Sequence, residues 1–98
     1  MAQFHAHRTR DGSLVMDCQS PILHGLDTTL VVPLEIEGRI RSPFSRMNPV
    51  LEINGSQMVL YPQGMATIPT SELSEPVADL EEQRDRIIGA IDVLITGV

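Results

Sequence analysis

The sequence predicts a small α+β domain, mainly β, in which short strands precede one C-terminal helix. Three observations lead to this fold class. Residues 28–37 form a β-branched run, Asn54-Gly55 separates two apolar segments, and aliphatic residues repeat at helical spacing from Leu80 onward. At 98 residues, the whole chain (1–98) is expected to form a single domain with one modest core.

The first two expected strands cover residues 14–18 and 28–37, with a Gln19-Ser20-Pro21 break after the first. The second has the stronger signal, because β-branched residues run through it and suit a pleated surface. Pro33 lies inside this strand and has no backbone N–H. We therefore expect this strand to lie at an edge or to carry a bulge.

A hairpin is expected over residues 49–61. Residues 49–53 and 56–61 flank Asn54-Gly55, and this dipeptide favours the left-handed torsions of a tight two-residue turn. Pro62-Gln63-Gly64 ends the second arm, and residues 65–69 form another short strand.

The C-terminal helix begins after Asp79, which is expected to be its N-cap, with Glu82 completing a pair that resembles a capping box. Gly97 is placed to end the helix. One stripe of the helix is expected to dock on the sheet as core; it consists of Ile87, Ile91, Leu94 and Ile95. The last four residues, 95–98, are apolar or small, so we expect them to lie in a subunit interface or to be presented to a partner.

Composition favours a cytoplasmic protein that works by binding. The chain has no Trp, one Tyr and two Phe, so its core must consist mainly of Ile, Val, Leu and Met, and pairing of two copies would add stability. The net charge of −6 opposes contact with a phosphate backbone, and Arg39, Arg41 and Arg46 are expected to form a solvated loop. The N-terminus lacks the apolar core of a signal peptide, and no apolar run is long enough to span a membrane.

Few residues suggest catalysis or a metal site. His5 and His7 would share one face of a strand, but two imidazoles need further ligands to hold a metal, so we expect both to be exposed on a fraying strand. A Ser-His-Asp catalytic triad could be composed of Ser20, His24 and Asp27, but the local spacing of these residues does not support one.

The single cysteine and the acidic pairs are also expected to have structural roles and no catalytic ones. The single Cys18 allows no intramolecular disulfide and is expected to be an inert buried thiol. The acidic pairs Glu35/Glu37 and Glu81/Glu82 are expected to keep a strand edge and a helix start solvated. We therefore expect no enzymatic activity, no cofactor and no metal.

Several segments, in this order and spacing, resemble the CcdB family, whose members are toxins of plasmid and chromosomal toxin–antitoxin pairs that poison DNA gyrase. The similar segments are Gln3-Phe4, Asp17-Cys18-Gln19-Ser20, Val31-Val32-Pro33-Leu34, residues 48–53, residues 65–69, residues 75–80, Ala90-Ile91 and Gly97-Val98. The resemblance implies an SH3-like barrel of the CcdB/MazF kind with a small extra sheet and a C-terminal helix, assembled as a homodimer.

The resemblance also implies partners and a site. The helix ends of the dimer would bind the gyrase A subunit and trap the gyrase–DNA cleavage complex. A CcdA-like antitoxin, expected to be disordered and partly basic, would remove the toxin and join it in repressing their operon, so DNA is contacted only indirectly. By similarity, the gyrase-binding residues are Thr96, Gly97, Val98, Asp92 and Gly89 on the helix, with Ile22 and Leu23 in a loop.

Two positions depart from the family's best-known member, which has Trp where this chain has Thr96 and an acid where it has Arg84. Loss of a buried Trp removes a typical interface anchor. Two alternatives therefore stay open: a MazF-like endoribonuclease toxin, and a non-toxic homologue that binds an antitoxin.

Overall fold

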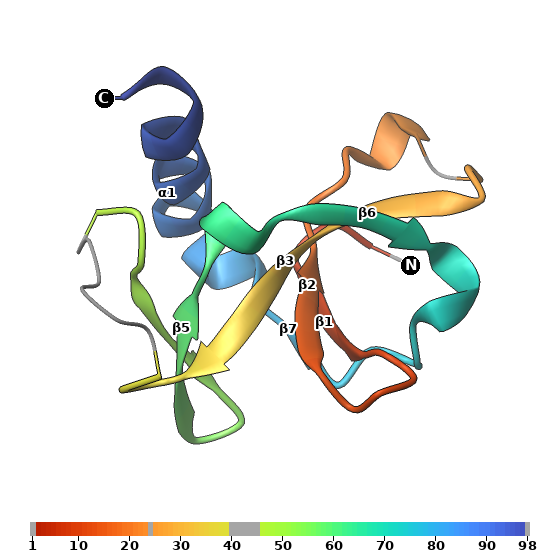
Figure 1. Ribbon diagram of the computed structural model, residues 1–98, viewed down its shortest axis with the longest axis horizontal. Helices are drawn as coiled ribbons and strands as arrows, with labels where there is room; N and C mark the ends of the chain where they lie inside the picture. Colours follow the sequence, from red (N-terminus) through yellow and green to blue (C-terminus); the bar gives the residue numbers. More distant parts are fainter. Residues whose placement is uncertain (1, 24, 40–45, 98) are drawn as a thin grey trace.

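The computed structural model describes residues 2–23, 25–39 and 46–97. Within these residues, seven strands form a nearly closed antiparallel barrel, and one helix follows them (Figure 1), so the predicted α+β class is confirmed. The strands are β1 (His5–Arg8), β2 (Leu14–Asp17), β3 (Thr28–Ile36), β4 (Val50–Ile53), β5 (Ser56–Leu60), β6 (Ala66–Pro69) and β7 (Ala78–Asp79). The helix is α1 (Arg84–Thr96), and the 3-10 turns are η1 (Pro21–Leu23), η2 (Pro62–Gly64), η3 (Thr70–Glu72) and η4 (Glu81–Gln83).

Strand β3 is the centre of the fold. The strand order is β4-β5-β3-β2-β1-β7, and β6 pairs with β3 as well. On one side β3 meets β2; on the other it meets β6 through residues 28–31 and then β5 through residues 34–36. The expectation of an edge strand was therefore wrong. Pro33 lies at the change from β6 to β5, where its missing N–H interrupts neither ladder, and its carbonyl accepts the N–H of Tyr61 at 2.9 Å.

The hairpin prediction is confirmed. Strands β4 and β5 are antiparallel, with Ile53 opposite Ser56 across a two-residue turn. Asn54 and Gly55 have φ angles of 51° and 85°, and two positive φ angles in succession define the type I′ turn that suits the twist of a hairpin.

Strand β1 lies between β2 and β7, so the expectation that its histidines are exposed on a fraying strand was wrong. His7 is completely buried, and its Nδ1 lies 2.8 Å from the carbonyl oxygen of Ser74. His5 is partly buried, with Nε2 3.6 Å from a carboxylate oxygen of Asp79. The two-residue strand β7 covers this edge of β1, and its short sequence gave no strand signal.

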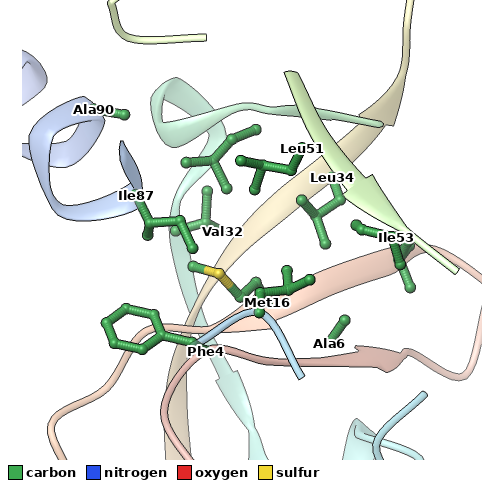
Figure 2. Close-up of a cluster of buried hydrophobic side chains, with 12 residues drawn as sticks. Phe4, Ala6, Met16, Val32, Leu34, Leu51, Ile53, Ile87 and Ala90 are labelled. Carbon is green, nitrogen blue, oxygen red and sulfur yellow. The ribbon is translucent and has the colours of Figure 1, made fainter. Parts of the chain in front are cut away.

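The helix joins the barrel through its first two turns. Ile87 and Ala90 are fully buried and face Phe4, Met16 and Val32 inside the barrel (Figure 2). As the composition predicts, this core is almost entirely aliphatic, and its interdigitated side chains fix how the helix leaves the sheet.

The predicted end of the helix is confirmed, but its predicted start is wrong. The expectation that Asp79 is the N-cap of the helix, paired with Glu82, was wrong, because α1 begins at Arg84 with Gln83 at the N-cap position and no side-chain cap. The Asp79 carboxylate instead accepts the N–H of Glu81, the first residue of η4, at 2.9 Å. Gly97 has φ 80° and donates its N–H to Val93 O at 3.0 Å, so it ends the helix as predicted. Across the described residues, no helix is long and apolar enough to cross a membrane.

Candidate functional site: the free end of the helix

The first turns of α1 are held firmly against the barrel. The Arg86 guanidinium donates to Val50 O at 2.7 Å, and the Gln83 side chain donates to Glu52 O at 3.2 Å. The guanidinium of Arg84 lies 5.6 Å from the centroid of the Phe4 ring, within the range of a cation–π contact. These contacts hold the direction in which the helix projects.

The last turn of α1 extends beyond the barrel (Figure 1). Leu94 is 40% exposed and Ile95 is 69% exposed, although both belong to the stripe that was expected to dock on the sheet. That expectation was wrong for these two residues and right for Ile87, which is buried; Ile91 is half-buried. The periodic pattern is longer than the surface available to cover it. Two aliphatic side chains therefore project into solvent at the helix end.

The helix end also carries polar groups and negative charge beside these aliphatic side chains. Thr96 donates its hydroxyl to Asp92 O at 2.7 Å, which satisfies one of the carbonyls left free at a helix end. The partial negative charge of the helix C-terminus and the Asp92 carboxylate add to each other, and the last turn contains no basic residue. Thr96 and Gly97 are exposed, and Val98 lies outside the described residues. This tip presents apolar surface beside negative charge, which suits a partner with an apolar recess and a nearby cation.

Gly89 lies on the same helix face as Asp92 and Thr96, since residues three and seven positions apart share a face. A Cβ at Gly89 would meet no atom within 4 Å, so packing within this chain does not require a glycine there. A glycine inside a helix costs about 1 kcal/mol relative to alanine. The face therefore offers a partner an unusually close approach to the backbone.

The loop pair predicted for the same site lies elsewhere in the protomer. Ile22 and Leu23 belong to η1 and are 88% and 45% exposed. Figure 1 shows η1 (orange) and the end of α1 (dark blue) toward opposite ends of the long axis. One protomer thus brings together Gly89, Asp92, Thr96 and Gly97, but not the loop pair. Leu26, also exposed, was not predicted, and no periodicity marked it.

The candidate catalytic residues are not assembled into a reactive centre in the part of the chain that the structure describes. No group of three or more His, Cys, Asp or Glu residues there is placed to hold a metal ion. Burial and the neighbouring Asp17 raise the pKa of the Cys18 thiol to about 11, so it stays protonated and unreactive at neutral pH. His24 and Arg41 lie outside the described residues, while Arg39 and Arg46 are exposed as expected.

A second feature is a groove of about 760 Å³ between the β1–β2 turn, β3 and β6. Arg8, Arg10 and Arg39 line it together with apolar residues of β2, β3 and β6. Arg10 is 3.5 Å from Glu72, and Arg8 donates to Gly12 O at 2.9 Å, so two of the three arginines already have partners within the chain.

Three acids in the described part of the chain line this groove, Asp11, Glu35 and Glu72, and Asp11 is poorly suited to donate a proton. Hydrogen bonds from Thr9 and Ser13 lower the pKa of Asp11 to about 2, so Asp11 is an anion at neutral pH. Among the described residues, the groove lining contains no histidine. The charged side chains of the groove can bind a ligand, and Asp11 is not a suitable general acid at neutral pH.

Comparisons of the sequence and of the fold with known proteins identify a family. The family model described as "CcdB protein" matches residues 3–97. A mycobacterial endoribonuclease, solved in complex with its cognate antitoxin, superposes with a TM-score of 0.80 at 10% identity, over 97% of this chain and 94% of that one. The Mycobacterium tuberculosis toxin MazF-mt6 gives a TM-score of 0.75 at 15% identity, over 96% of both chains. At these identities the two structures establish a shared fold, which confirms the predicted barrel.

Proposed function

Because the chain belongs to the CcdB family of toxins, we propose that it is a toxin that binds the A subunit of DNA gyrase and traps the gyrase–DNA cleavage complex. The observation that carries this proposal is the free end of α1, where Ile95 is 69% exposed beside Thr96 and Gly97. An aliphatic tip on a rigidly held helix is suited to insertion into a recess of a larger protein. The activity is binding, and the toxin itself makes or breaks no covalent bond.

The contact surface consists of the helix residues Gly89, Asp92, Thr96, Gly97 and Val98, together with the loop residues Ile22 and Leu23. The exposed residues Leu94 and Ile95 extend its apolar part. The negative helix end attracts a lysine or arginine of the gyrase subunit. Thr96 provides less buried area than a Trp would, so binding is weaker than in a relative with Trp at this position.

The toxin acts as a homodimer. Among the described strands, β6 pairs with β3 alone, so its second edge is available to another chain. A two-fold dimer also suits a target with two A subunits, since each helix end can meet one of them.

A CcdA-like antitoxin is the second partner. Support comes from the family and from the similarly folded endoribonuclease, which was solved with its own antitoxin. The net charge of −6 attracts a disordered segment with basic residues, which can fold along the surface as it binds. The complex of toxin and antitoxin then represses their operon, with DNA contacted through the antitoxin.

Induction of this chain alone tests the proposal. We expect loss of viability, relieved by substitutions in the gyrase A subunit. In vitro, purified gyrase should accumulate cleaved plasmid when the protein is added. Normal growth under full induction of the folded protein would instead favour a non-toxic homologue that only binds an antitoxin.

The alternative is an endoribonuclease toxin, which the shared fold and the arginine-lined groove favour. The low pKa of Asp11 and the lack of histidine in the described lining weigh against it. Incubation of the purified protein with total RNA decides between the two, because site-specific cleavage without gyrase would establish the alternative.

A further inference from the structure

We infer that Asn54-Gly55, the turn between β4 and β5, is a site of spontaneous chemical modification, in which the Asn54 amide is hydrolysed through a cyclic imide. The reaction needs no enzyme and no cofactor, because both reacting groups belong to the turn and the second reactant is water. Neither residue belongs to the proposed gyrase-binding surface, so this site is independent of the proposed function.

The chain has two asparagines, and only one of them has the neighbour that the reaction requires. Ring closure needs a backbone N–H on the next residue, whose nitrogen attacks the side-chain amide carbon. Asn48 precedes Pro49, which has no N–H, and Asn48 is buried with its amide bonded to Leu60 O at 3.1 Å. Asn54 precedes Gly55, both residues are exposed, and Gly55 has no side chain to hinder the approach of its nitrogen. The reaction is therefore expected at Asn54 and not at Asn48.

The similar dipeptide Asp11-Gly12 has an environment that opposes the same ring closure. Hydrogen bonds, with the largest effect from Thr9, lower the pKa of Asp11 to about 2, so this side chain is an anion that resists attack by a nitrogen at neutral pH. The Gly12 N–H is also engaged, because it donates to Thr9 O at 3.0 Å. The Gly55 N–H, in contrast, lies in the turn, beyond the last residue pair of the β4–β5 ladder.

The reaction has two steps and releases ammonia. The Gly55 nitrogen forms a bond to Cγ of Asn54, the Cγ–Nδ2 bond breaks, and Nδ2 leaves as ammonia with the proton of the Gly55 N–H. Water then hydrolyses the imide at either of its carbonyls. Attack at Cγ leaves an aspartate at position 54, and attack at the main-chain carbonyl leaves an isoaspartate, whose main chain is longer by a methylene group. Both products carry one more negative charge than the −6 of the unmodified chain.

The amide that leaves also ties the hairpin to the segment before β7. Asn54 Nδ2 donates to Val77 O at 3.0 Å, and the Val77 N–H donates to Ala6 O of β1 at 2.8 Å. Both products lose the Nδ2 donor and place a carboxylate, which only accepts hydrogen bonds, near the Val77 carbonyl. Modification therefore loosens β7, the short strand that covers the edge of β1 beside the buried His7.

The folded turn restrains this reaction. Because Nδ2 of Asn54 is bound to Val77 O, ring closure requires the amide to release that carbonyl first. The reaction therefore proceeds from a locally opened hairpin, and its rate depends on how often the turn opens. Modified chains accumulate with the age of the protein.

Ageing of the purified protein tests the site. The full chain is incubated at mildly alkaline pH beside the variant Asn54→Gly, in which Gly-Gly still suits a type I′ turn but offers no amide. Anion-exchange chromatography detects the added charge, and peptide mass spectrometry locates it. We expect a more acidic species in the wild type, modified at position 54, and none in the variant. A synthetic peptide of residues 50–60 should react faster than the folded chain, because it has no Val77 to bind the amide.

Two results of this experiment would overturn the inference. One is a wild-type chain that stays unmodified after the peptide has been fully converted. The other is equal formation of the acidic species in the wild type and in Asn54→Gly, which would place the reaction at another residue.

Amide hydrogen exchange tests the consequence for β7. Asn54→Asp reproduces one of the two products, and aspartate is tolerated at a positive φ, so the turn is kept. We expect the Val77 N–H to exchange about fivefold faster in Asn54→Asp and in the aged wild type, the ratio that corresponds to the net loss of one hydrogen bond. The Cys18 N–H, which donates to Leu30 O outside β7, should exchange as before. Unchanged exchange at Val77 in both proteins would overturn the link between the modification and β7.

Discussion

Replacement of Ile95 by alanine should weaken gyrase binding without weakening the fold. Ile95 has 69% of its surface exposed in the protomer, so most of its burial remains to be gained on binding. Complete burial of an isoleucine side chain contributes about 1.5–3 kcal/mol, and the exposed part therefore corresponds to about 1–2 kcal/mol. This predicts a Kd for the gyrase A subunit that is about 5 to 30 times higher in Ile95→Ala.

Calorimetry with purified gyrase A subunit measures this change in Kd, and two further variants serve as controls. Ile36→Ala removes an isoleucine of similar exposure at the end of β3 and should leave the Kd unchanged. Ile87→Ala empties a fully buried site on the same helix and should cost about 2–5 kcal/mol of stability, seen as a lower Tm. An unchanged Kd for Ile95→Ala, or a Tm loss comparable to that of Ile87→Ala, would refute the assignment of Ile95 to a contact surface.

Three further predictions concern other parts of the molecule. Thr96→Trp should lower the Kd for the gyrase A subunit at least about tenfold, and an unchanged or higher Kd would mean that position 96 is not an anchor here. Gly97→Ala should destabilise the fold by about 1 kcal/mol in chemical denaturation, because φ 80° is strained for any residue with a Cβ; unchanged stability would contradict the left-handed cap. Burial raises the pKa of Asp17 above its ordinary value, so around these pKa values the folded state binds more protons than the unfolded state. The free energy of unfolding therefore falls as the pH rises from the unfolded pKa through the higher folded pKa. Asp17→Asn, which can still accept the Gln19 N–H, should therefore be more stable than the wild type at pH 7 and gain nothing near pH 3 in urea titrations; an equal gain at both pH values would reject this cause.

The local signals in the sequence predicted local structure well. Asn54-Gly55 specifies a turn that needs two positive φ angles, and Gly97 ends the helix, because both effects depend on the backbone preferences of one or two residues. Pro33 and His7 were misjudged, since their environments depend on strands distant in sequence. β6 and β5 meet near Pro33, and β7 covers β1, neither of which a local pattern reveals.

The sequence predicted which residue types lie at the candidate site, but it did not predict how exposed they are or how far apart they lie. The apolar residues near the end of the helix were visible in the sequence, but the exposure of Leu94 and Ile95 depends on how far α1 extends beyond the barrel. Similarly, resemblance placed Ile22 and Leu23 in the same site as Thr96, while the fold separates them within one protomer. Distances of this kind arise from the whole topology, and no spacing along the chain encodes them.

The proposed function requires that the exposed helix end acts by binding gyrase and not by cutting RNA. Incubation of supercoiled plasmid with purified gyrase and either the full chain or a chain ending at Ile95 tests it most directly. We predict that linear plasmid accumulates with the full chain and that the shortened chain has no such effect. The Tm of the shortened chain should fall by no more than about 8 °C, the shift that a loss of about 1 kcal/mol causes in a domain of this size. Equal cleavage with both chains, or no cleavage with the full chain and specific cutting of RNA in the absence of gyrase, would contradict this account.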